Sequence, residues 1–167
     1  MHFYDLKFKT PQGEEISMDT FKGKAVLVVN TATKCGLAPQ FKELEALHQE
    51  YRDQGLVVIG FPCNQFRNQE PETNESMEEN CEINFGVSFQ LTEKIDVNGK
   101  HTHPVFEFLK NYLPGKLSKK IKWNFTKFLI TPEGVPIQRW APTVRPLALE
   151  QQIRAVLPIH QFADEGE

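Results

Sequence analysis

The feature that most constrains the fold of this chain is a pair of short, continuous apolar segments. Residues 25–30 read AVLVVN and residues 56–61 read LVVIGF. Runs of this kind are typical of strands that are buried on both faces of a sheet. The apolar residues between them recur at helical spacing: Phe41, Leu44, Leu47 and Tyr51. The pattern therefore predicts a βαβ unit with parallel strands and a right-handed crossover.

Shorter elements surround this unit. Alternating apolar residues on either side of a turn at 10–13 predict an N-terminal β-hairpin. The remaining patterns predict a helix capped by Asn74 and running through Cys81, a strand at 91–97, a helix at 104–113, strands at 125–131 and 135–140, and a closing helix at 147–157. We expect an α/β fold in which helices flank both faces of a central mixed sheet. At 167 residues the chain is expected to form a single domain, 1–167.

Charge and hydropathy exclude several classes of protein. The formal net charge is -3, and lysine and arginine are scattered, so a nucleic-acid partner is not expected. The N-terminus has neither the basic nor the apolar region of a signal peptide, and no apolar run approaches the roughly 20 residues that a bilayer crossing requires. These observations predict a cytoplasmic protein without stable membrane insertion.

The cysteines are the residues best suited to a reactive role. There are three, Cys35, Cys63 and Cys81, which is too few and too odd a number for a secreted disulfide framework. Cys35 lies just after a predicted buried strand and just before a predicted helix. The positive end of a helix dipole and the neighbouring Lys34 would favour the thiolate form there. Cys35 is therefore the candidate nucleophile.

Three segments then resemble one known family. Residues 30–40 (NTATKCGLAPQ), residues 60–66 (GFPCNQF) with the following Gln69, Glu70 and Pro71, and residues 123–128 (WNFTKF) are similar, in order, to the three signature blocks of glutathione peroxidases. The similarity extends from about residue 3 to residue 157. The resemblance implies a thioredoxin-like fold and a peroxidase that reduces hydrogen peroxide and organic hydroperoxides, without a bound cofactor or metal.

The resemblance also implies roles for individual residues. Cys35 would be the peroxidatic nucleophile, and Gln69, Trp123 and Asn124 would surround it as catalytic partners. Neutral amide and indole donors suit this chemistry, because they steady an anionic sulfur and a developing alkoxide without neutralising either permanently. Cys81 matches the resolving cysteine of the thioredoxin-using members, and would trap the Cys35 sulfenic acid as a disulfide.

One departure from the family concerns the reductant. The connection between Leu113 and Trp123 is short, whereas tetrameric members that use glutathione carry an insertion there. Together with Cys81, the short connection favours thioredoxin as the reductant and a monomer or homodimer as the assembly. The physiological peroxide and a minor role for glutathione stay open.

Other polar residues receive structural interpretations. We expect Cys63 to be a packed small side chain, and His101 and His103 to be solvated loop residues, because no further ligand segment accompanies them. The acidic residues between Glu75 and Glu82 are expected to be a solvated helix face.

Competing functions remain at this stage. A peroxide sensor or adaptor without turnover would use the same thiols, and glutathione could be the main reductant. A cysteine hydrolase would need a histidine beside Cys35, and His48 and His103 lack an evident orienting partner. A C-x-x-C oxidoreductase is excluded, because Ala38 stands where its second cysteine would be.

Overall fold

The predicted βαβ unit forms the centre of the molecule. In the computed structural model, which describes residues 1–158, strand β3 (Ala25–Thr31) pairs in parallel with β4 (Leu56–Pro62), and helix α1 (Gln40–Tyr51) connects them. Every residue of β3 is buried, as expected for a strand covered on both faces.

Three further strands complete the sheet, whose order is β5-β4-β3-β6-β7. Strand β5 (Gln90–Leu91) joins β4 in parallel, while β6 (Lys127–Ile130) and β7 (Pro136–Trp140) are antiparallel to their neighbours. The expected mixed sheet is thus confirmed, and so is the N-terminal hairpin of β1 (Lys7–Lys9) and β2 (Glu15–Ser17).

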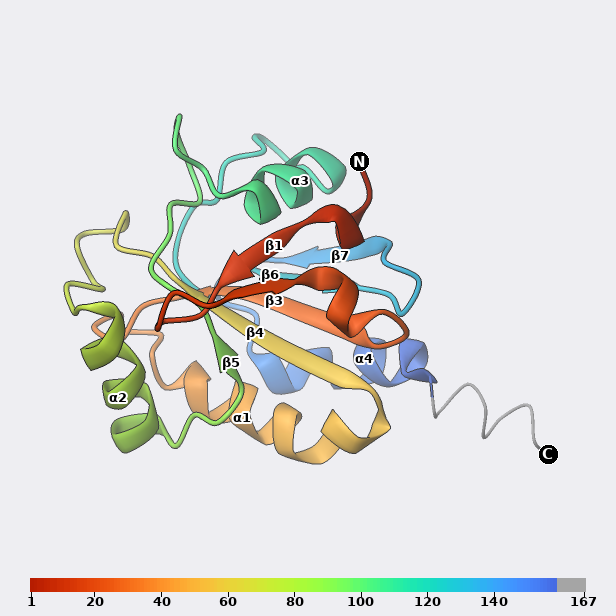
Figure 1. The fold of residues 1–167 in the computed structure, drawn as a ribbon, viewed down its shortest axis with the longest axis horizontal. Helices are drawn as coiled ribbons and strands as arrows, with labels where there is room; N and C mark the ends of the chain where they lie inside the picture. Colours follow the sequence, from red (N-terminus) through yellow and green to blue (C-terminus); the bar gives the residue numbers. More distant parts are fainter. Residues whose placement is uncertain (159–167) are drawn as a thin grey trace.

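Helices cover both faces of the sheet. Figure 1 shows α1 and α4 (Glu150–Val156) on one side, and α3 (Pro104–Tyr112) together with the hairpin on the other. Two apolar clusters fill these layers, one on each side of the sheet. None of the helices within residues 1–158 has the length and hydropathy that a bilayer crossing needs.

The strand expected at 91–97 is wrong beyond its first residue. Only Gln90 and Leu91 pair with β4, which ends at Pro62. The Oε1 atom of Gln65 accepts hydrogen bonds from the backbone N–H groups of Val97 and Asn98, at 2.7 and 3.1 Å. Between these ends, the Thr92 and Ile95 N–H groups donate to the Gly60 and Pro62 carbonyls of β4, but no continuous strand pairing extends past Leu91.

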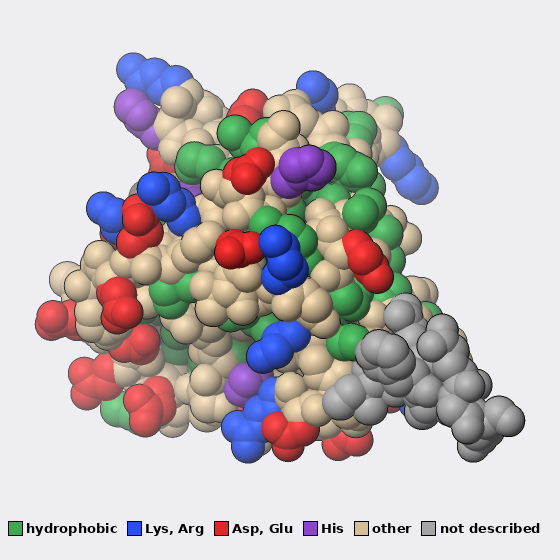
Figure 2. Space-filling view, turned by 45° about the vertical axis from the view of Figure 1, so that its right-hand side comes forward, with side chains coloured by type: hydrophobic (Ala, Val, Ile, Leu, Met, Phe, Trp, Pro, Cys, Tyr) green, Lys and Arg blue, Asp and Glu red, His purple; other side chains and the backbone are tan. Residues whose placement is uncertain are grey.

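Helix α2 (Asn74–Phe85) also differs in detail from the prediction. The cap is Thr73, whose hydroxyl accepts a hydrogen bond from the Ser76 N–H at 3.1 Å. The Asn74 side chain instead accepts one from the Lys94 N–H at 2.8 Å. Figure 2 shows acidic side chains over the side of the molecule where α2 lies, which agrees with the solvated acidic face that was expected.

Candidate active site

Cys35 lies in a series of tight turns between β3 and α1. Its side chain is 5% exposed, and its Sγ accepts a hydrogen bond from the Leu37 N–H at 3.4 Å. Helix α1 begins at Gln40, so Cys35 precedes the helix, as expected, but lies outside its first turn. Since the effect of a helix dipole falls off within the first turn, the N–H groups of the turn are the nearer source of positive potential for the sulfur.

Gln69 and Asn124 meet in the structure, although 55 residues separate them in the sequence. The Asn124 Nδ2 donates a hydrogen bond to the Gln69 Oε1 at 3.1 Å. The Gln69 backbone carbonyl in turn accepts one from the Lys34 N–H at 2.9 Å, directly beside Cys35. Asn124 is fully buried, and its Oδ1 has no hydrogen-bond partner within the described part of the chain. An unpaired buried amide oxygen of this kind is available to a substrate or to water.

Trp123 lies at the boundary between the two apolar clusters. It is half-buried and packs against both, including the cluster that contains Cys35. Its ring lies 5.5 Å from the Phe66 ring, and the Arg67 guanidinium lies 5.8 Å from the ring centroid. Arg67 thus adds a cation beside an expected catalytic side chain.

Asn30 holds the Trp123–Asn124 segment in place, a role that the sequence interpretation missed. From the end of β3, its Nδ2 donates to the Trp123 carbonyl at 3.2 Å, and its Oδ1 accepts from the Thr126 N–H at 3.0 Å. The Asn30 side chain is fully buried. The available signal was an amide side chain at the end of an otherwise apolar strand, since buried polar groups are almost always paired.

The backbone is strained next to two of the expected catalytic positions. Within residues 1–158, the non-glycine residues with positive φ are Arg67 at 54°, Asn68 at 52° and Phe125 at 66°. Arg67 and Asn68 directly precede Gln69, and Phe125 directly follows Asn124. Strain of this kind costs about 1–3 kcal/mol per residue and concentrates at functional sites.

Cys81 is fully buried on α2. Cys81 and Met77 are the buried residues of this helix, and both belong to the apolar cluster that contains Cys35. Burial raises the pKa of the Cys81 thiol to about 12, and the nearby Glu70 and Glu78 carboxylates add to the shift. In this conformation Cys81 is therefore a protonated thiol.

Cys63 packs as a small buried side chain, as expected, in the cluster on the opposite face of the sheet. Burial raises the pKa of its thiol to about 11. The structure thus places Cys35 and Cys81 in one cluster and Cys63 in the other.

Alkylation of the native, reduced protein is expected to distinguish the three thiols. Iodoacetamide at pH 7 should modify Cys35 well before Cys63 and Cys81, because a thiol of pKa about 12 is ionised to only ~10⁻⁵ at that pH. Peptide mass analysis after timed quenching measures each rate. In denaturant all three should react alike, and a native Cys81 that reacted as fast as Cys35 would contradict the burial described above.

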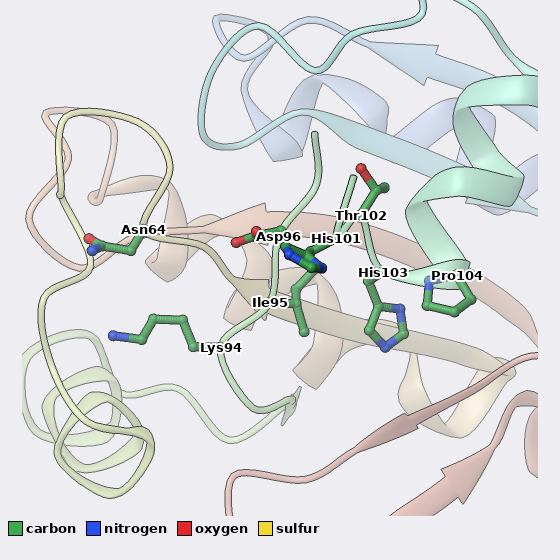
Figure 3. Close-up of a pocket in the computed structure, with 8 residues that line it drawn as sticks. All are labelled: Asn64, Lys94, Ile95, Asp96, His101, Thr102, His103 and Pro104. Atoms are coloured by element: carbon green, nitrogen blue, oxygen red, sulfur yellow. The ribbon is translucent and has the colours of Figure 1, made fainter. Parts of the chain in front are cut away.

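The histidines do not form a second centre. His103 is not the solvated residue that was expected: its Nδ1 caps α3 by accepting the Val105 N–H at 3.1 Å, and its ring packs on Phe61. Burial lowers the pKa of His103. With the exposed His101 it lines a surface pocket of about 510 Å³ (Figure 3). No group of three or more metal-ligating side chains suited to a metal ion occurs in residues 1–158.

His48, the other histidine considered for a cysteine hydrolase, also packs against the core. His48 on α1 packs against the Phe89 ring at 6.4 Å, and burial lowers its pKa. Neither His48 nor His103 has a carboxylate or amide oriented against it in the manner of a catalytic triad among the hydrogen bonds of the described residues.

The sheet order and the cysteine that follows the central strand β3 are those of a thiol oxidoreductase with a thioredoxin-like fold. The chain belongs to the glutathione peroxidase family, whose sequence model matches residues 3–110. A glutathione peroxidase of Lactococcus lactis is 51% identical over 94% of this chain and 100% of its own length. The glutathione peroxidase-like peroxiredoxin 2 of Saccharomyces cerevisiae is 48% identical over 93% of this chain and 96% of its own length.

Comparison with solved structures agrees with the family assignment. The crystal structure of Trgpx in its apo form superposes with a TM-score of 0.78 at 39% identity, and the match covers 93% of this chain and 95% of that one. The thioredoxin-like fold expected from the family resemblance is confirmed. The protein is thus a peroxidase, an oxidoreductase that reduces peroxides.

Proposed function

We propose that Cys35 is the peroxidatic residue and attacks hydrogen peroxide or an organic hydroperoxide as a thiolate. The S–O bond forms as the O–O bond breaks, and the leaving oxygen takes up a proton and departs as water or an alcohol. The Cys35 sulfur is oxidised to a sulfenic acid while the peroxide is reduced. Gln69, Trp123 and Asn124 would donate hydrogen bonds to the sulfur and to the departing oxygen.

Cys81 is the proposed resolving residue. Its sulfur would attack the Cys35 sulfenic acid, so that a disulfide forms and water leaves. The observation that carries this assignment is the position of Cys81 in the same apolar cluster as Cys35, whereas Cys63 lies across the sheet. Because Cys81 is buried and protonated, α2 must open locally before the sulfurs can meet. Few of its side chains are buried, which makes such opening inexpensive.

Thioredoxin is the proposed reductant, with glutathione at most a minor one. A dithiol reductant would break the Cys35–Cys81 bond through a mixed disulfide and leave with its own disulfide, which restores both thiols. The peroxiredoxin name of the yeast relative supports this assignment over an obligatory use of glutathione. We further propose that the chain acts in the cytoplasm as a monomer or homodimer, with residues 1–167 forming one domain.

Peptide mass mapping after one equivalent of hydrogen peroxide tests the two thiol assignments together. After that one equivalent we expect a Cys35–Cys81 disulfide in the wild type and a Cys35 sulfenic acid, trapped with dimedone, in Cys81→Ser. Further equivalents of peroxide should oxidise Cys35 of Cys81→Ser to the sulfinic and sulfonic acids, since its sulfenic acid has no thiol to trap it. The mapping compares tryptic peptides with and without prior reduction. A Cys35–Cys63 bond in the wild type would overturn the role of Cys81.

A turnover assay separates the enzyme from a sensor. With thioredoxin, thioredoxin reductase and NADPH, the proposed peroxidase consumes many equivalents of peroxide, whereas a sensor stops after one. Replacing the thioredoxin system by glutathione and glutathione reductase should give much slower turnover. Equal or faster turnover with glutathione would contradict the proposed reductant.

A further inference from the structure

Glu70 is a buried charged residue that the proposed catalytic cycle leaves without a role. Its side chain is fully buried, which is rare for a glutamate. Burial raises the pKa of its carboxyl, against the opposing effect of hydrogen bonds from Thr33. Within residues 1–158 the carboxylate makes no salt bridge. A buried glutamate without a salt bridge needs hydrogen-bond donors to stabilise its carboxylate.

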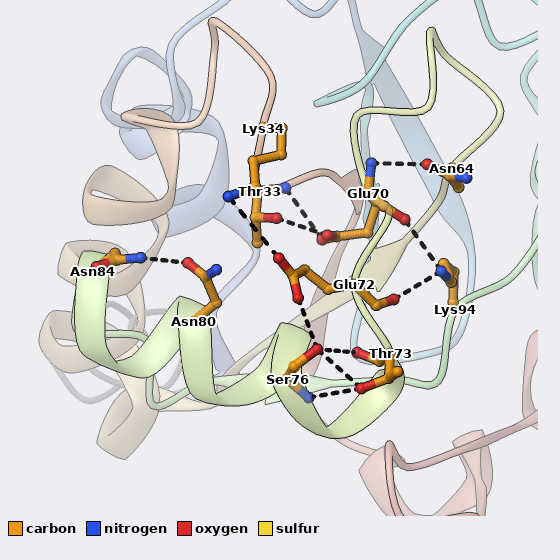
Figure 4. A network of polar contacts seen from close by, with 10 residues as sticks. All are labelled: Thr33, Lys34, Asn64, Glu70, Glu72, Thr73, Ser76, Asn80, Asn84 and Lys94. Atoms are coloured by element: carbon orange, nitrogen blue, oxygen red, sulfur yellow. Dashed lines mark hydrogen bonds and ion pairs between the residues drawn. The ribbon is translucent and has the colours of Figure 1, made fainter.

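Both Glu70 carboxylate oxygens accept hydrogen bonds from one residue, Thr33. It belongs to the turns at residues 33–39 that contain Cys35, which we call the Cys35 turn. The Thr33 N–H donates to Oε1 at 3.1 Å, and the Thr33 hydroxyl donates to Oε2 at 2.6 Å. The neighbouring residues repeat the connection, because the Lys34 N–H donates to the Gln69 carbonyl at 2.9 Å. Two successive residues of one loop are thus tied to two successive residues of the other. Figure 4 shows the Glu70 side chain reaching Thr33 from the segment that leads into α2.

The same segment is anchored on its other side. The Lys94 ammonium donates to the backbone carbonyls of Glu70 and Glu72, at 3.1 and 2.8 Å, and the Asn64 Oδ1 accepts the Glu70 N–H at 2.9 Å. The segment continues directly into the Thr73 cap and α2, which carries Cys81. Any movement of α2 that delivers Cys81 must therefore act on the segment that Glu70 fixes to the Cys35 turn.

We propose that Glu70 is a positioning residue, whose carboxylate clamps the Cys35 turn to the segment before α2 in the conformation that reacts with peroxide. The clamp orders Cys35 and Gln69 for attack, and its release accompanies the opening of α2 that resolution requires. This inference rests on the proposed roles of Cys35 and Cys81. It predicts that a weakened clamp changes the two steps in opposite directions.

Thr33→Val is the sharper test, because it removes one hydrogen bond while it keeps the shape of the side chain, whereas Glu70→Ala would leave a cavity. Rapid quenching measures the loss of the Cys35 thiol over time. Its dependence on peroxide concentration gives the second-order rate constant of attack. We expect it to fall about tenfold, as for the loss of a hydrogen bond to a charged group. The first-order rate constant for Cys35–Cys81 disulfide formation should rise several-fold in the same samples.

Two further variants make the test specific. Thr33→Ser retains the hydroxyl and should restore both rate constants to near their wild-type values. Leu109→Ala weakens the core on the opposite face of the sheet, and should lower the melting temperature while leaving the ratio of the two rate constants unchanged. If Thr33→Val lowered both rate constants together, or changed neither, the proposed positioning role of Glu70 would be wrong. If the wild type formed no Cys35–Cys81 disulfide, the proposed function itself would have failed.

Discussion

Cys35→Ser is expected to abolish peroxide turnover, with a loss of at least ~10³-fold in kcat/KM. A serine hydroxyl is not appreciably ionised at neutral pH and does not reduce an O–O bond, so the first step of the proposed cycle would be lost. The measurement is NADPH consumption in the thioredoxin-coupled assay, with hydrogen peroxide and an organic hydroperoxide as separate substrates. Circular dichroism should show an unchanged fold, because the exchange is nearly isosteric.

The matched control is Cys63→Ala, which removes a buried thiol from the opposite face of the sheet. This variant should retain turnover within about threefold, at a modest cost in stability, since the Cys63 thiol contributes packing and one weak hydrogen bond to the Gln65 Oε1. Wild-type turnover in Cys35→Ser, or a folded but inactive Cys63→Ala, would contradict the assignment of Cys35 as the nucleophile.

Asn30→Leu is expected to destabilise the protein by about 3 kcal/mol and to lower kcat at least tenfold. The leucine has a similar volume but can neither accept the Thr126 N–H nor donate to the Trp123 carbonyl, so buried polar groups would lose their partners. The strained backbone at Phe125 would then lose the support that fixes Trp123 and Asn124. Urea unfolding and the thioredoxin-coupled assay measure the two effects.

Asn111→Leu supplies the comparison for this prediction. Asn111 lies on the exposed face of α3, so the same exchange should change the free energy of unfolding by no more than about 0.5 kcal/mol. Equal stability losses in the two variants would show that the hydrogen bonds of Asn30 have no special importance for the segment that they hold.

Much of the fold followed from apolar periodicity. The continuous runs at 25–30 and 56–61 became β3 and β4, and the helical spacing between them became α1. The two strands are buried along nearly their whole length, and burial on two faces leaves a strong imprint on residue type. The three signature blocks predicted the family and the candidate catalytic residues. Such motifs can be identified from residue type and order alone.

The errors share a different origin. The segment 91–97 alternates as a strand does, yet its backbone N–H groups bond to separate partners, among them the Lys9 and Pro62 carbonyls and the Gln65 side chain. Asn74 resembled a helix cap, but its side chain binds the Lys94 N–H, and Thr73 is the cap. In both cases a partner distant in the sequence decided the outcome, and local pattern carries no information about such a partner.

The amino-acid sequence by itself determined the central strands, the helices that cover them and the identity of the candidate nucleophile, since these depend on local spacing and on residue chemistry. Tertiary structure alone decided that Gln69 meets Asn124, that Asn30 supports Trp123, that Cys81 shares a core with Cys35, and that the Glu70 carboxylate binds Thr33. The physical reason is that hydrogen bonds and pKa values depend on which groups burial brings together, and that arrangement exists only once the sheet has assembled.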